Sequence, residues 1–248
     1  MFNLAQKKPV RSDGEGRNIQ SDMYVNRRTA KSNRMRRTKE EAEQTRRRIM
    51  VAALRTFNRR GIARTTLEQI AEAARVTRGA IYWHFSGKEA LLRTIREDVS
   101  LPLVDQSDFT LLNEAAGEPL DSVEQFLLDL LSAVEKDEHT RLVFSVMSFK
   151  CEYVGELVSE LKDYVRKNER LCGALTRTYT EARRRGALRK RLTPRLAALE
   201  TIVFVAGLMR LWLLDETRSG VRKTARALIR AHVDGYRSHA RAKKTSES

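Results

Sequence analysis

The sequence predicts an all-α protein with a small N-terminal domain and a larger C-terminal one, and three observations carry that prediction. Apolar residues recur at the three-to-four residue spacing of one helix face in successive segments between residues 39 and 242. No stretch of that range alternates apolar and polar residues convincingly, as a half-buried strand does. Thr, Ser, Gly and Pro stand at the ends of these segments, where they cap or stop helices.

Residues 1–38 are predicted to form a disordered basic extension, because they are polar and show no periodic apolar face. The first predicted helix follows directly. Thr38 is placed to cap it, and Glu41 completes a capping box three residues later. The apolar stripe of this helix ends near Phe57, and Gly61 offers a left-handed stop.

Three shorter helices are predicted next. Thr65 or Thr66 caps the second helix, whose apolar positions fall on one face: Leu67, Ile70, Ala71 and Ala74. A tight turn at Arg75 and Val76 leads to a third helix that Thr77 opens. Ser86 caps a fourth helix that runs from about Gly87 toward Ser100.

The rest of the chain predicts further helices after a partly broken connection between Pro102 and Pro119. These helices lie near residues 120–135, 139–164, 166–186, 194–214 and 221–242. The predicted domains are the extension at 1–38, a DNA-binding domain at 39–97, and a ligand-binding and dimerisation domain at 98–248.

The charge of the chain is strongly positive and concentrated toward the N-terminus. The formal net charge is +16, and residues 1–38 hold ten Lys and Arg against three Asp and Glu. Displacing counterions from phosphates is the main source of nucleic-acid affinity, so a basic end predicts a polyanion partner such as nucleic acid. An anionic membrane surface would attract the same charge, so charge alone does not decide between the two.

The sequence lacks the motifs that are typical of membrane, secreted, metal-binding and catalytic proteins. The longest apolar run, Ile202 to Met209, falls short of the ~20 residues that a membrane span needs. The N-terminus has no apolar h-region, so no secretory signal is expected. Cys151 and Cys172 suit a reducing cytoplasm as free thiols, with a single disulfide as the alternative. No metal-binding, nucleophile or phosphate-loop motif is present, so we expect no metal, no cofactor and no enzymatic activity.

The second and third helices, joined by a short turn, match a helix-turn-helix, whose second helix enters the DNA major groove. Gly79 and Ala80 would let the backbone approach the bases, with the Ala80 methyl against a thymine methyl. Arg78 would reach a guanine or a phosphate, while Ile81 and Phe85 face inward. The predicted DNA-binding residues are Arg46, Thr66, Thr77, Arg78, Gly79, Ala80, Tyr82, Trp83, His84 and Lys88. Partial burial of Trp83 against the first helix, and a merely solvated Arg46, are the alternatives.

Three segments carry a family resemblance: RRIMVAALRTFNRRG, TTLEQIAEAA and VTRGAIYWHFSGKEAL. Residues 39–100, which contain them, resemble the DNA-binding domain of the TetR family of transcriptional regulators. One position departs from the family pattern, because Arg75 stands where glycine is usual. A left-handed arginine there would cost on the order of 1 kcal/mol.

FKCEYVGEL, from Phe149 to Leu157, resembles a segment of the AcrR and TtgR-type repressors that control multidrug efflux pumps. The resemblance implies a homodimeric repressor that leaves a palindromic operator when a hydrophobic small molecule binds. A regulator of lipid or aromatic metabolism fits nearly as well, and a non-specific architectural DNA-binding protein is a further alternative.

The resemblance also implies a dimer interface and an apolar ligand cavity in the C-terminal domain. The interface candidates, which plain core packing would also explain, are Leu199, Val203, Ala206, Gly207, Trp212, Ile229, Val233 and Tyr236. The cavity candidates are Phe126, Leu130, Phe144, Met147, Cys151 and Phe204. Met and Phe suit an adaptable pocket, but the same residues are more often core.

Overall fold

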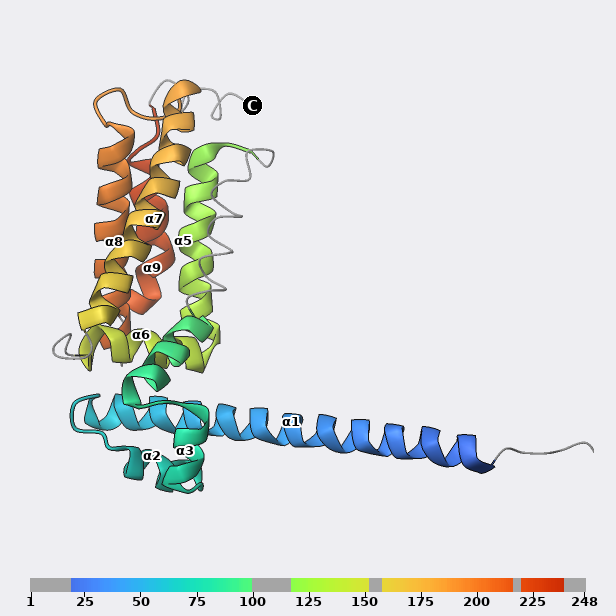
Figure 1. Ribbon diagram of the computed structural model, residues 1–248. Helices are drawn as coiled ribbons and strands as arrows, with labels where there is room; N and C mark the ends of the chain where they lie inside the picture. Colours follow the sequence, from blue (N-terminus) through green and yellow to red (C-terminus); the bar gives the residue numbers. More distant parts are fainter. Residues whose placement is uncertain (1–18, 100–116, 152–157, 216–219, 239–248) are drawn as a thin grey trace, which may run out of the picture. The chain divides into compact units, whose positions relative to one another are not determined.

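The computed structural model describes residues 19–99, 117–151, 158–215 and 220–238 (Figure 1). Within these ranges every regular element is a helix, apart from one isolated bridge between Leu188 and Arg237. The prediction of an all-α fold is therefore confirmed. The chain divides into two units, Met1–Thr45 and Arg46–Ser248, and each is described by itself.

Helix α1 (Ile19–Arg60) begins 20 residues before the predicted start. Residues 19–38 are helical here, where the sequence analysis expected disorder, and Thr38 lies inside the helix instead of capping it. No Gly or Pro interrupts the sequence from Ile19 to Arg60. Because Arg, Lys, Met and Ala all favour helix, nothing in this stretch stops α1 at the predicted cap. Gly61 follows with φ 80°, the left-handed stop that was predicted.

The head of the second unit consists of the end of α1, α2 (Leu67–Ala74), α3 (Arg78–His84) and a helix at residues 88–99. Its apolar side chains form one cluster, the head cluster: Ile49, Met50, Ala52, Ala53, Leu54, Phe57, Ile62, Ile70, Ala71, Ala74, Ile81, Phe85, Leu91, Leu92, Ile95, Val99, Val143 and Val146. Val143 and Val146 come from α6 (Glu138–Phe149), so this helix packs into the head.

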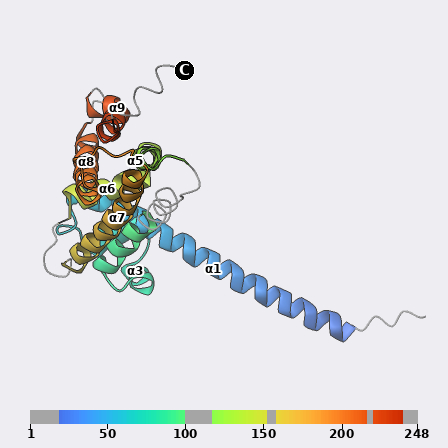
Figure 2. The ribbon, with the colours of Figure 1, turned by 90° about the horizontal axis from the view of Figure 1, so that it is seen from above.

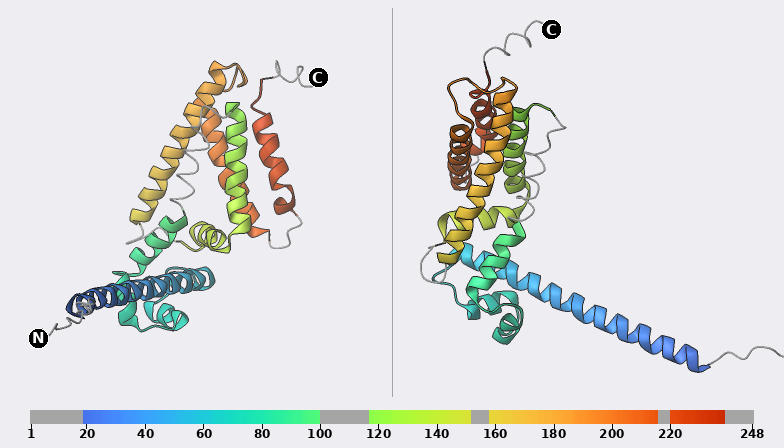
Figure 3. Two further views of the ribbon diagram at one scale, coloured as in Figure 1. Left: turned by 90° about the vertical axis from the view of Figure 1, so that its right-hand side faces the viewer. Right: turned by 45° about the horizontal axis from the view of Figure 1, so that its top comes forward.

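The body consists of α5 (Pro119–Lys136), α7 (Val158–Arg184), α8 (Pro194–Leu214) and α9 (Val221–Asp234), which lie side by side in Figures 1 and 3. Figure 2 views the same helices from one end. Their buried residues form the body cluster: Leu120, Val123, Phe126, Leu127, Leu131, Val134, Cys172, Ala174, Leu175, Tyr179, Ala182, Ala187, Leu188, Ala197, Ala198, Val205, Leu208, Met209, Trp212, Ala225, Ile229, Val233 and Tyr236.

Two predicted helix boundaries in the body were wrong. A break was predicted near residue 165, but α7 continues from Val158 through to Arg184 because no helix breaker lies there. The break falls earlier, since α6 ends at Phe149 and the Lys150 carbonyl accepts the N–H of Ile62 at 3.2 Å. The last helix ends at Asp234 and not at residue 242.

The early end of α9 has a visible cause. After Gly235 the chain turns and pairs with the segment that follows α7: Arg189 donates its N–H to the Tyr236 carbonyl at 2.9 Å, and Ser238 donates to Ala187 at 2.7 Å. These hydrogen bonds need extended backbone, so the helix cannot continue past them.

Helix α8 starts as predicted, with Pro194 in the first turn and the Thr193 hydroxyl accepting the Leu196 N–H at 3.2 Å. By length and composition it is the one helix in the described ranges that could cross a membrane. Six of its seven buried residues belong to the body cluster, as expected of a core helix in a globular domain.

Candidate DNA-binding surface

Local capping fixes the α2-turn-α3 geometry. The Thr66 hydroxyl accepts the Gln69 N–H at 3.3 Å, and the Gln69 side chain accepts the Thr66 N–H at 3.2 Å, which completes a capping box. Arg75 ends α2 with φ 55° and ψ 47°, and it is the one non-glycine residue with positive φ in the described ranges. The predicted left-handed arginine is therefore confirmed. Its N–H and that of Val76 bond carbonyls of the last turn of α2.

Buried side chains hold α3 against the rest of the head. Ile81 and Phe85, one turn apart, are both buried in the head cluster with Ile70 and Ala74. The guanidinium of Arg46 lies 5.5 Å from the centre of the Phe85 ring, so the half-buried Arg46 also packs against this end of α3. The predicted inward face of the helix is thereby confirmed.

The outer face of α3 is open in the free chain. Trp83 is 74% exposed and Tyr82 48% exposed, so the alternative in which Trp83 packs against the first helix was wrong. The Trp83 ring meets the half-buried His84 ring edge to face, with centroids 4.5 Å apart. Both rings are therefore accessible to another molecule.

Gly79 shows no internal reason to be glycine. Its φ lies outside the left-handed region, and an added Cβ would meet only the Thr77 hydroxyl oxygen, at 3.8 Å. Ala80 beside it donates its N–H to the Thr77 hydroxyl at 3.1 Å, which makes Thr77 the N-cap of α3. The small side chains therefore leave the first turn of α3 bare toward solvent.

Arg78 is held by two neighbours. One terminal nitrogen pairs with the Glu68 carboxylate of α2, and the other donates to the Tyr82 hydroxyl at 3.0 Å. The guanidinium also lies 5.4 Å from the centre of the Tyr82 ring. Glu68 was not among the predicted residues; its only signal in the sequence was its place as an acidic residue in the first turn of α2.

Lys88 has a structural role that the sequence analysis missed. Its ammonium donates to the carbonyls of Ile62 and Thr65, at 3.0 and 3.2 Å, and so ties the helix at 88–99 to the α1–α2 loop. An ammonium has three donors, so these bonds leave one N–H for a phosphate.

Comparison with known proteins matches both parts of the chain. Residues 49–95 match the family described as bacterial regulatory proteins, tetR family. Residues 118–238 match the C-terminal region of MAATS-type transcriptional repressors. The chain is 37% identical over 181 residues to the HTH-type transcriptional regulator TtgR of Pseudomonas putida, covering 73% of this chain and 85% of TtgR. The chain belongs to the TetR family.

Solved structures of other TetR-like regulators share this fold. NalD, described as the secondary repressor of the MexAB-OprM multidrug efflux pump in Pseudomonas aeruginosa, superposes with a TM-score of 0.72 at 28% identity, covering 79% of this chain and 99% of NalD. The SmeT–triclosan complex gives 0.68 at 25% identity, covering 79% of this chain and 93% of SmeT. SmeT is described as the repressor of the Stenotrophomonas maltophilia multidrug efflux pump SmeDEF. The predicted family and a head built on a helix-turn-helix are confirmed.

For a TetR-family regulator, the residues predicted at the dimer interface fall into two groups. Leu199, Val203, Ala206 and Gly207 are exposed on α8, and Val203 is 72% exposed. Trp212, Ile229, Val233 and Tyr236 belong to the body cluster instead. These four are buried within the single chain, as the core-packing alternative expects. Leu196, Leu211 and Leu214 are exposed apolar residues of α8 that the prediction omitted.

The residues predicted to line a TetR-type ligand cavity do not gather in one place. Phe126 is buried in the body cluster, and Leu130 and Phe204 pack against it. Met147 and Cys151 pack against the head cluster instead, and Phe144 touches both clusters. The Phe204 ring stacks on the His232 ring with centroids 4.0 Å apart. A cavity lined by all six residues would therefore have to lie between the head and body clusters.

Proposed function

We propose that this protein is a homodimeric repressor that binds a palindromic operator through α3 of each subunit and controls a multidrug efflux operon. A hydrophobic small molecule would bind in the body and release the DNA. As a DNA-binding regulator it would act in the cytoplasm. The observation that carries the proposal is the bare first turn of α3, presented by buried anchors in a TetR-family head.

The chemistry of that surface suits duplex DNA. Gly79 and Ala80 leave room for base edges, and Ala80 offers a methyl group to thymine. Arg78 offers a planar set of N–H donors that match guanine O6 and N7. The hydroxyls of Thr66 and Thr77, with Tyr82 and Lys88, would position the helix through phosphates.

The exposed apolar face of α8 supports a dimer. Leu199, Val203, Leu211 and Leu214 are exposed on one helix of a domain whose core is already filled. Gly207 lies among them, and a Cβ there would meet no atom within 4 Å, so a second helix can approach closely. Two such faces would form an isologous interface, which places two copies of α3 on one side of the DNA.

The efflux assignment draws on relatives, since NalD and SmeT are both described as repressors of multidrug efflux pumps. The helix at 88–99 would couple the body to the head, because Leu91, Leu92 and Ile95 lie in the head cluster while Arg96 pairs with Asp163 of α7 at 3.2 Å. The Arg96 guanidinium holds the pKa of Asp163 below its ordinary value of 3.8. A ligand that binds better to one position of this helix changes the affinity of the protein for DNA. By linkage, DNA changes the affinity of the protein for the ligand by the same factor.

The proposal is tested by selecting DNA from a random 30-bp pool with the purified chain. We expect a palindrome whose half-sites lie about 34–36 Å apart, one helical turn, or near that spacing. Triclosan, the compound bound in the SmeT complex, then serves as a hydrophobic probe, and we expect it to weaken binding to the selected duplex. If selection yields no preferred sequence, the architectural alternative replaces this proposal. If triclosan binds by calorimetry yet leaves DNA affinity unchanged, the release mechanism is wrong.

A further inference from the structure

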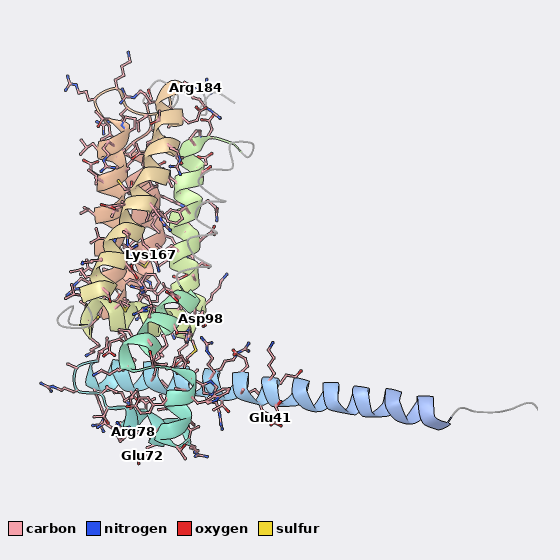
Figure 4. The ribbon with its side chains drawn as sticks, in the orientation of Figure 1. Glu41, Glu72, Arg78, Asp98, Lys167 and Arg184 are labelled. Atoms are coloured by element: carbon pink, nitrogen blue, oxygen red, sulfur yellow. The ribbon has the colours of Figure 1, made fainter. Side chains whose placement is uncertain are left out.

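The pairing of Arg78 with Glu68 joins the two helices of the DNA-binding motif. Glu68 stands in the first turn of α2 and Arg78 in the first turn of α3. Their side chains are 55% and 57% exposed, so the pair lies at the surface and not in the core. Figure 4 shows Arg78 on the outer side of the head.

Glu68 has hydrogen-bond partners besides Arg78. Its own backbone N–H and the Thr66 side chain hold the pKa of Glu68 below its ordinary value of 4.5, and the charge of Arg78 adds to the effect. The carboxylate is therefore ionised at neutral pH. Its position does not depend on Arg78 alone.

The pairing changes what Arg78 offers to DNA. Contacts with Glu68 and Tyr82 take one N–H from each terminal nitrogen, while a guanidinium carries five. Donors remain available, but the positive charge is cancelled by a carboxylate beside it. A guanidinium whose charge is offset by a carboxylate still bonds a neutral acceptor such as guanine O6 or N7. It gains little from a phosphate, because that gain comes from net charge and released counterions.

We propose that Glu68 is a specificity-determining residue, which suppresses phosphate contacts by Arg78 and reserves its donors for base edges. The inference rests on the proposed function, since it takes α3 as the DNA-reading helix. Glu68 would touch no base itself. It would act by lowering the affinity for DNA of the wrong sequence more than for the operator.

The test compares E68Q with the wild-type chain on two duplexes: the one selected from the random pool, and a scrambled duplex of the same composition. We expect E68Q to bind the scrambled duplex on the order of five- to tenfold more tightly at 0.1 M salt, with a salt slope steeper by about 0.9, as for one added phosphate contact. Affinity for the selected duplex should change less than this, so the ratio of the two affinities should fall.

E72Q is the matched control, because Glu72 is an exposed glutamate one turn further along α2, on the same outer side of the head (Figure 4). It removes the same charge without touching Arg78. If E72Q lowers the affinity ratio as much as E68Q, net charge explains the effect and the inference fails. In a chain that also carries R78A, E68Q and E72Q should lower the affinity ratio equally. If E68Q lowers the ratio in that chain as much as it does in the wild-type chain, the inference also fails. Failure to select any duplex would instead count against the proposed function.

Discussion

At the scale of single residues, a substitution at Gly79 should change stability and DNA affinity in opposite directions. Because its φ is one that any residue adopts and a Cβ would make only an ordinary contact with Thr77, Gly79→Ala fits the fold. Alanine in a helix is favoured over glycine by about 0.5–1 kcal/mol. We expect G79A to raise the free energy of unfolding slightly, measured by chemical denaturation, while lowering affinity for the selected duplex at least about tenfold through a clash with the bases.

Gly173→Ala provides the control. Gly173 lies within α7, and a Cβ there would meet only the Arg177 side chain at 3.7 Å. This variant should gain similar stability and keep the DNA affinity of the wild-type chain. Equal affinities for G79A and the wild-type chain would show that the first turn of α3 does not approach DNA.

His232 predicts a pH dependence of stability. Burial lowers the pKa of His232 below its ordinary value of 6.5, and its Nε2 lies 3.2 Å from the Thr201 hydroxyl. The folded chain therefore binds this proton less well than the unfolded chain. The stabilisation by neutral His232 is complete above pH 6.5 and is lost as the pH falls through 6.5 toward the folded pKa. Urea denaturation between pH 5 and 8 measures the effect.

Comparison of the wild-type chain with H232Q separates the effect of His232 from that of the other titrating groups. H232Q removes the titrating group and keeps a polar side chain near Thr201. The difference in unfolding free energy between the wild-type chain and H232Q should change over this pH range. A constant difference would mean that His232 does not carry the effect.

Residue roles set by local sequence were predictable, and roles set by helix crossing were not. Thr77 and Gly61 act within a few residues of their own position, so sequence spacing identified them, and it limited the cap of α2 to Thr65 or Thr66. Glu68 and Lys88 act on partners ten or more residues away. Which residues meet across a helix pair depends on the crossing geometry, which a single sequence does not state.

At the scale of elements, α8 shows which features of a helix the apolar pattern predicts and which it does not. The sequence predicts a helix that is apolar around most of its surface, and its bounds were correct. The pattern could not divide the helix into faces, because nearly every position was apolar. The structure makes that division: Trp212 packs into the body cluster, while Val203 is exposed.

In α7 the predicted bounds were wrong instead. A break was predicted near residue 165, although no residue there would interrupt a helix.

The exposed face of α8 yields a prediction about assembly. Val203→Glu should raise the dimer dissociation constant by at least about 100-fold, since it would bury an unpaired carboxylate at two symmetry-related positions. Because Val203 is exposed in the single chain, the helical content by circular dichroism should not change. Sedimentation equilibrium measures the dissociation constant.

Val165→Glu is the matched variant, with the same substitution at an exposed valine of α7. It should leave the dissociation constant within about threefold of the wild-type value, as expected outside an interface. If V165E dissociates the dimer and V203E does not, the interface lies on α7.

At the scale of the whole molecule, the uneven charge predicts that the N-terminal extension contributes to DNA binding. Residues 19–38 are part of α1 and hold six Lys and Arg against one Asp. Arg27, Lys31 and Arg34 recur at helical register positions i, i+4 and i+7. At 1.5 Å per residue, the helix from residue 19 to 45 is about 40 Å long, which exceeds one turn of duplex DNA. We therefore predict that this helix contacts phosphates of its own.

The salt dependence of binding tests this role without truncating the chain. One variant replaces four basic residues of the extension by Gln: Arg27, Arg28, Lys31 and Arg34. Its matched control replaces four exposed basic residues of the body by Gln: Arg170, Lys190, Arg191 and Lys223. Both lose four charges, so a general effect of net charge would weaken them equally. We expect the slope of log K against log salt on the scrambled duplex to fall by about 2–4 units for the first variant only, at ~0.9 per phosphate contact. Equal slopes for the two variants would place the extension away from DNA.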